Sequence, residues 1–207
     1  MSPVFHARTI EVSGVAHLSK DEVVRLAGIS SGTNLLWLDT GTVQRRLEQN
    51  PWIRMATVRR SFPARVQIDV VEREPLVVVR GKGGPVLIAA DGRRLGAARR
   101  GDAFPRVVGK DLEAPIRVIA PMPRWLRREV DRVSIAWDGS VRVLLETGVH
   151  IEYGSATETA KKAAALAGLL QWSEQAGTKL VAVDVRFPDA PTARMIGTTP
   201  SGSSPSH

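Results

Sequence analysis

Hydrophobic side chains occupy alternate positions in two neighbouring segments, residues 53–62 and 64–74, which meet at Phe62-Pro63. Val66, Ile68 and Val70 alternate with charged and polar residues along the second segment. Successive side chains of a strand point to opposite faces of its sheet, so this pattern is typical of a sheet with one buried face. The two segments therefore predict neighbouring strands joined by a turn.

The residues before these strands carry the signals of two short helices. Ser19 followed by Glu22 is a capping box, and Gly28 is a stop signal at the end of the same helix. The second helix is capped by Asp39 or Thr40. A short alternating segment precedes both helices and predicts a first strand. The resulting order is β-α-α-β-β.

From Pro75 onward the pattern is that of a domain made mostly of strands. The glycine-rich segment 81–84 is interpreted as a hairpin turn, and Asp138-Gly139 between two alternating segments is a second hairpin signal. A long helix over residues 157–175 precedes a last strand.

The fold class predicted from these elements is α+β. We expect a β-α-α-β-β domain, then a mixed, mostly β domain with a long C-terminal helix and an edge strand. The final residues include no core-forming side chains, which predicts a disordered tail. The expected boundaries are residues 4–74, 75–195 and 196–207.

No group of residues has the spacing of a catalytic or metal site. The four histidines are spread along the chain and there is no cysteine. The glycines at 81–84 precede a strand, whereas a phosphate-binding loop precedes a helix. We therefore expect no catalytic residue, no metal and no cofactor.

The net charge of +8 comes from 29 basic and 21 acidic residues. The arginines are scattered singly and in pairs, without the stacking aromatics of a nucleic-acid surface, so a solvated basic surface is the preferred interpretation. We expect no nucleic-acid partner. No apolar run reaches the ~18 residues that a membrane span needs.

The last strand leaves two interpretations open. Val183, Val185 and Phe187 alternate with Asp184 and Arg186. A terminal strand at a sheet edge offers an unpaired ladder to another chain. Alternatively, the two charges protect the edge against such pairing.

Motifs along most of the chain resemble the FtsQ/DivIB family of cell-division proteins. The first domain is similar to that family's POTRA (polypeptide-transport-associated) domain, and the resemblance covers roughly residues 5–195. The motifs that carry it are Val12-x-Gly14, GTNLLWLD, Pro51-Trp52, EREP at 72–75, AADGRRLG, FPRVVG, WDGSVRVLLETGVHIEYGS and VDVRF.

The resemblance implies an extracytoplasmic scaffold and not an enzyme. Family members have a short cytoplasmic tail, one membrane helix, the POTRA domain and the β domain, so a single-pass cell-membrane protein is expected. The membrane helix is missing here, which suggests a fragment or a shortened gene reading. The implied partners are division proteins of the FtsB/DivIC and FtsL type and, indirectly, the septal peptidoglycan synthase.

In this family a partner docks by adding an extended segment beside the C-terminal strand and the neighbouring helix. Carried over, the resemblance places the partner-binding site on five consecutive residues: Val183, Asp184, Val185, Arg186 and Phe187.

Two further expectations concern the first domain. Its charged end is interpreted as an interdomain hinge, because Pro75 blocks ladder continuation and the charges favour solvent. The alternative function is a POTRA-type polypeptide-binding chaperone module of a secretion or outer-membrane assembly system, binding chains at strand 64–71 if that strand is an open edge. The hinge residues are Glu72, Arg73, Glu74 and Pro75.

Overall fold

The computed structural model describes residues 5–99 and 101–195, and these form two compact units. The first unit runs to Pro75 and takes in Ala89–Gly96, while the second comprises Leu76–Ile88 and the residues from Ala97 onward. The tail predicted at 196–207 lies outside the described residues.

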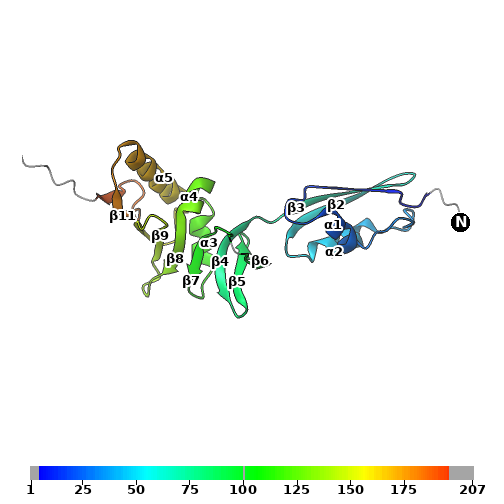
Figure 1. The fold of residues 1–207 in the computed structure, drawn as a ribbon, viewed down its shortest axis with the longest axis horizontal. Helices are drawn as coiled ribbons and strands as arrows, with labels where there is room; N and C mark the ends of the chain where they lie inside the picture. The colour runs from blue at the N-terminus through cyan, green and yellow to red at the C-terminus, as the bar shows by residue number, and fades with distance from the viewer. Residues whose placement is uncertain (1–4, 100, 196–207) are drawn as a thin grey trace, which may run out of the picture. The chain divides into compact units, whose positions relative to one another are not determined.

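The first unit has the predicted β-α-α-β-β order (Figure 1). Its sheet has the order β1-β3-β2, in which β3 is parallel to β1 and antiparallel to β2. Because β3 is flanked on both sides, the alternative docking edge at strand 64–71 is wrong. The elements are β1 (Thr9–Ser13), α1 (Lys20–Ala27), α2 (Thr40–Glu48), β2 (Ile53–Ser61) and β3 (Arg65–Glu72).

Alternation along β3 builds the core of this unit. Val66, Ile68 and Val70 are buried and pack with apolar residues of both helices in one cluster, including Val23 and Leu47. At about 25 cal/mol per Å² of apolar surface, burying such side chains is the main stabilising term for a sheet of only three strands.

Both helix starts follow from their capping residues. The Ser19 hydroxyl accepts from the Glu22 amide at 3.2 Å, and the Glu22 carboxylate accepts from the Ser19 amide at 2.8 Å, which confirms the capping box. Gly28 ends α1 with a φ of 67°. Asp39 caps α2, accepting from the amides of residues 41 and 42, and this resolves the choice between Asp39 and Thr40.

A nine-stranded sheet lies mainly in the second unit, in the order β12-β11-β10-β9-β8-β7-β4-β5-β6. Its strands are β4 (Pro75–Gly81), β5 (Gly84–Ala89), β6 (Arg94–Ala97), β7 (Arg106–Val108), β8 (Val130–Ile135), β9 (Val141–Leu145), β10 (His150–Gly154), β11 (Leu180–Asp184) and β12 (Thr192–Met195).

Three helices cover one face of this sheet, α3 (Glu113–Ile119), α4 (Arg124–Glu129) and α5 (Thr159–Gln175). Their buried residues and the inward side chains of the strands form a single hydrophobic cluster. The predicted helix over 157–175 is confirmed as α5, with Ala163 and Leu166 in the core, although Trp172 on the same helix is 50% exposed.

The elements that the sequence did not predict are short. α3 has seven residues and β12 has four. Helix α4 ends at Glu129, and from Val130 the chain continues as strand β8. The hairpin turn predicted at 81–84 is confirmed between β4 and β5.

Candidate functional site

The strand that was expected to dock a partner lies inside the sheet. β11 pairs in parallel with β10 and antiparallel with β12. Main-chain groups on both sides of β11 therefore have ladder partners. The prediction that this strand forms the open edge is wrong.

Two of the five predicted partner-binding residues belong to the core. Val183 is 1% exposed and lies between Ile151 and Ala193 in the ladders. Val185 is fully buried, and its amide donates to the Glu152 carbonyl at 3.0 Å. Neither side chain is accessible to another protein.

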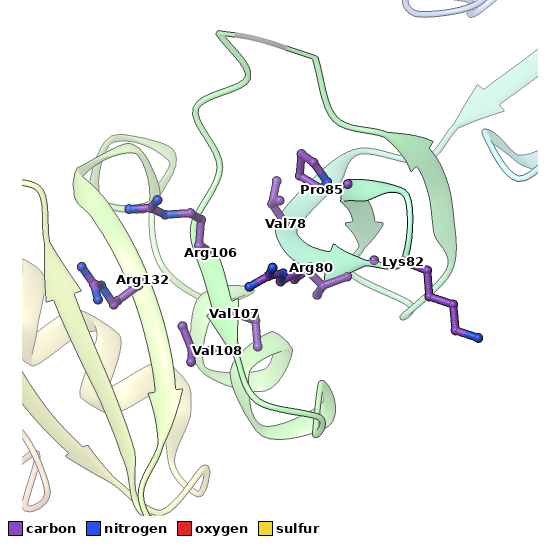
Figure 2. Close-up of a pocket in the computed structure, with 11 residues that line it drawn as sticks. Val78, Arg80, Lys82, Pro85, Arg106, Val107, Val108 and Arg132 are labelled. Carbon is purple, nitrogen blue, oxygen red and sulfur yellow. The ribbon is translucent and has the colours of Figure 1, made fainter.

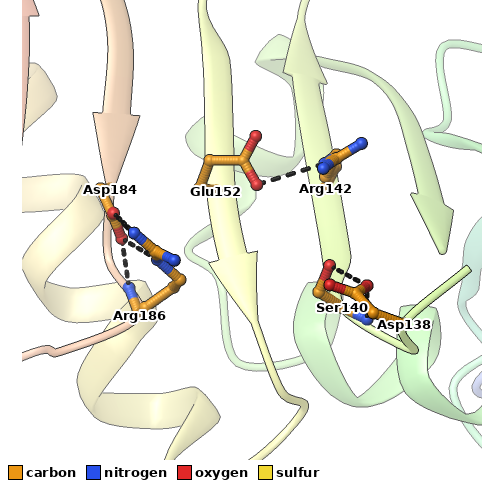
Figure 3. A network of polar contacts seen from close by, with 6 residues as sticks. All are labelled: Asp138, Ser140, Arg142, Glu152, Asp184 and Arg186. Atoms are coloured by element: carbon orange, nitrogen blue, oxygen red, sulfur yellow. Dashed lines mark hydrogen bonds and ion pairs between the residues drawn. The ribbon is translucent and has the colours of Figure 1, made fainter. Parts of the chain in front are cut away.

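Asp184 and Arg186 form an ion pair on the open face of the sheet (Figure 3). The Arg186 Nη2 donates to Asp184 Oδ2 at 2.6 Å, and the Arg186 amide donates to Oδ1 at 2.9 Å. The guanidinium holds the pKa of the Asp184 carboxyl below its usual value. This pair fixes the course of the chain where it leaves β11.

The lowered pKa gives a prediction for acid unfolding. A carboxyl whose pKa is depressed by folding contributes stability above its unfolded pKa, and this contribution is lost as the pH falls through the folded value. Asp184→Asn is therefore expected to unfold more easily at neutral pH, and the difference from the native chain should shrink below about pH 4. Urea unfolding of both proteins across this range tests it, and a difference that stays constant with pH would contradict it.

Phe187, the last residue of the predicted set, is 72% exposed. Its carbonyl accepts from the Ala190 amide at 3.1 Å, in the turn that carries the chain from β11 back into β12. The structure therefore places Phe187 in a connecting loop and not on a strand.

β12 is the outermost strand at this end of the sheet. Within the described part of the chain it pairs only with β11, so its other side lacks a strand neighbour. Met195 is 49% exposed, and Thr192 and Arg194 are exposed too. Beside them, a groove of about 440 Å³ crosses the open face over β10, β11 and β12.

Sequence reasoning missed this edge because four residues give too short a pattern to stand out. A signal was nevertheless present in the turn-forming residues Pro188, Asp189 and Pro191, which separate two short alternating segments. These residues indicate that the chain reverses after β11.

The residues of the expected hinge make contacts within the first unit. The Glu72 carboxylate accepts from the amides of His17 at 2.7 Å and Leu18 at 2.9 Å. Arg73 donates to the Ile53 carbonyl at 2.5 Å and to Asp91, which belongs to the same unit, at 2.6 Å. The hinge, including Glu74 and Pro75, stays a prediction.

Two features of other protein classes are absent from residues 5–99 and 101–195. No three His, Cys, Asp or Glu side chains are placed there to hold a metal ion. No helix in these residues has the length and apolarity to cross a membrane.

Comparison with known proteins identifies both parts of the chain. Residues 5–73 match the FtsQ-type POTRA domain, and residues 77–186 match the C-terminal region of cell division protein FtsQ/DivIB. The chain belongs to the FtsQ/DivIB family. The resemblance seen in the sequence motifs is thereby confirmed.

Relatives from several bacteria align with most of the chain. Cell division protein FtsQ of Mycolicibacterium smegmatis is 31% identical over 200 residues, or 93% of this chain and 58% of that protein. FtsQ of Bradyrhizobium diazoefficiens is 29% identical over 190 residues, or 89% of this chain and 55% of the relative. FtsQ of Streptomyces griseus is 29% identical over 198 residues, which cover 88% of this chain and 93% of that relative.

The chain thus spans little more than half the length of the first two FtsQ relatives. The FtsQ/DivIB C-terminal match ends at Arg186, so Phe187 and β12 lie beyond it.

Proposed function

We propose that this chain is the extracytoplasmic part of a membrane-tethered, single-pass scaffold of the bacterial divisome. Its role is to bind other division proteins during septum formation. The partners are proteins of the FtsB/DivIC and FtsL type and, through them, the septal peptidoglycan synthase. The scaffold has no catalytic step of its own.

Binding occurs by strand addition at β12. The observation that carries this proposal is the unpaired side of β12 within the described chain. Main-chain hydrogen bonds from an added strand supply affinity, and side chains beside the edge select the partner. Compared with the site expected from the sequence, the docking strand lies one position further out, at β12 instead of β11.

Phe187 and Arg194 are the residues best placed to select the partner. Phe187 is 72% exposed in the turn before β12, and Arg194 is exposed on β12 itself. An exposed aromatic ring that becomes buried on binding is a common source of interface energy, and a cation at the rim steers an acidic partner.

Phe187→Ala is expected to weaken binding of a FtsB/DivIC-type extracytoplasmic segment about tenfold, because the aromatic contact is lost. Fluorescence anisotropy with the labelled segment measures this. Trp137→Ala is the matched control, since Trp137 is 98% exposed in the turn between β8 and β9. Equal affinity of both variants would remove Phe187 from the site, and no saturable binding of the native chain would refute the proposal.

A further inference from the structure

The nine-stranded sheet has a second face that no helix covers within the described chain. The strand register places side chains of six neighbouring strands in one line across this face. The residues next to them in the sequence point to the opposite face, and those such as Val107, Val133 and Val143 belong to the core. The line runs through Arg106, Arg132, Leu144, His150, Ala182 and Arg194.

Positive charge gathers where this line reaches β7 and β8. Arg106 and Arg132 are direct cross-strand partners, and their side chains are 63% and 50% exposed. Like charges directly opposite one another destabilise a sheet. Asp131 offsets part of this repulsion by pairing with both guanidiniums, at a place where the register between β8 and β9 shifts.

Arg80 adds a third guanidinium from the neighbouring strand β4. It lies two residues beyond Val78, which pairs with Arg106. Among the described residues, no hydrogen bond or ion pair involves the Arg80 side chain, so Asp131 is the one carboxylate paired within this group of three arginines. The local charge is therefore positive.

A groove of about 470 Å³ lies among these arginines (Figure 2). The β4–β7 ladder registers only two pairs, ending at Val79 and Val107, after which β4 continues into its hairpin with β5. Gly81 keeps this hairpin narrow, because a Cβ at that position would lie 2.8 Å from Val86 Cγ2. The groove lies where β4 and β7 separate beyond these two pairs.

The lining combines cations with apolar side chains. Val78, Pro85 and Val108 contribute apolar surface, and Val108 is 55% exposed. Lys82 also lines the groove, although Figure 2 shows its side chain extending away from the arginines. The lining includes no hydroxyl or amide side chain and no helix N-terminus, which are common donors to phosphate.

We infer that this groove binds an acidic polypeptide segment in extended form. The carboxylates of the segment pair with Arg80, Arg106 and Arg132. Its apolar side chains contact Val108. Guanidiniums form bidentate pairs with carboxylates, and the end of the short β4–β7 ladder offers main-chain groups to an extended chain. The mixture of valines and arginines favours a peptide over a phosphate polymer.

This site is separate from the proposed docking edge. β7 and β8 are separated from β12 by β9, β10 and β11 in the sheet. A variant that blocks β12 is therefore expected to leave the groove intact. Failure of one proposal can be distinguished from failure of the other.

The test uses a labelled peptide of about ten residues that repeats Glu-Glu-Val-Val, so that each face of the extended chain carries both residue types, and fluorescence anisotropy with the full chain. We expect saturable binding that weakens at least about tenfold when glutamine replaces glutamate, and that is lost at about 1 M salt, where the Debye length is ~3 Å. Absence of binding, or equal binding of the glutamine peptide, would overturn the inference.

Protein variants locate the binding. Arg80→Gln is expected to lower the affinity for the glutamate peptide about tenfold, and Arg80→Gln with Arg106→Gln further still. The single variant is expected to fold normally because it removes no hydrogen bond or ion pair among the described residues. The matched control is Arg54→Gln with Arg117→Gln, two exposed arginines on β2 and α3.

Two results would contradict the assignment. One is equal weakening by the control pair, which would show a general charge effect. The other is binding of long-chain polyphosphate or anionic vesicles through the same arginines without competition from the glutamate peptide, which would assign the groove to phosphate ligands.

Discussion

Replacing Gly14 by alanine is expected to unfold the first unit. Gly14 follows β1 with a φ of +78°, and a Cβ at this position would lie 1.9 Å from the Val70 carbonyl oxygen. Alanine in this backbone conformation costs about 1–2 kcal/mol, and forcing the neighbouring strand aside costs about 1–3 kcal/mol more. The total approaches the stability of a small domain, which is roughly 5 kcal/mol or more.

Gly32→Ala is the matched control for this prediction. Gly32 has a φ of +97°, but a Cβ at this position would have no atom within 4 Å, so the substitution brings the backbone strain without the collision. Hydrogen exchange on the full chain should show lost protection of β1, β2 and β3 in Gly14→Ala, with β8 to β10 unchanged. Equal protection in the two variants would contradict the steric account.

Proline in β12 is expected to weaken partner binding strongly at one of two neighbouring positions, residue 193 or residue 194. Ala193 and Arg194 pair with Val183 and Ala182, and in an antiparallel ladder such neighbours alternate between hydrogen-bonded and non-hydrogen-bonded pairs. Proline at one position removes an amide that faces β11, and at the other an amide that faces the free side.

One proline variant should therefore lose stability, and the other should lose affinity for the partner. The proline that removes a ladder amide lowers the melting temperature. The proline that removes an outward amide keeps it and weakens binding of the FtsB/DivIC-type segment by about 10- to 100-fold. Thermal unfolding and anisotropy on both variants test this. Two variants that fold and bind like the native chain would contradict strand addition at β12.

Elements with strong local signals could be predicted from the sequence. The capping box at Ser19 and Glu22, the alternation of β3 and the length of α5 each specify one local structure, and all three are present. These signals depend only on residues near one another in the chain. The sequence motifs along the chain were likewise sufficient to recognise the family.

The position of β11 within its sheet could not be predicted in this way. The alternation of Val183 and Asp184 identifies a strand but not its neighbours, because strand order depends on contacts between distant segments. The strand that covers the outer side of β11 is β12, which has only four residues. A segment of this length is too short for alternation of hydrophobic residues to predict a strand. The alternation therefore suggested β11 as the edge strand, whereas β12 is the outermost strand at this end of the sheet.

The groove beside Arg106 illustrates the same limit. Arg80, Arg106 and Arg132 are far apart in the sequence and look like scattered surface arginines. Only the parallel pairing of β7 with β4 and β8 brings them together. A charge count of +8 gives no information about such clustering.

Hydrogen exchange of the β12 amides with and without a FtsB/DivIC-type segment tests the central proposal most directly. If the partner adds a strand here, alternate amides among Thr192–Met195 should gain protection, because the outward donors acquire acceptors. The opposite edge strand β6 should not change. Protection confined to β6 or to the first unit, with β12 unaffected, would contradict the proposal.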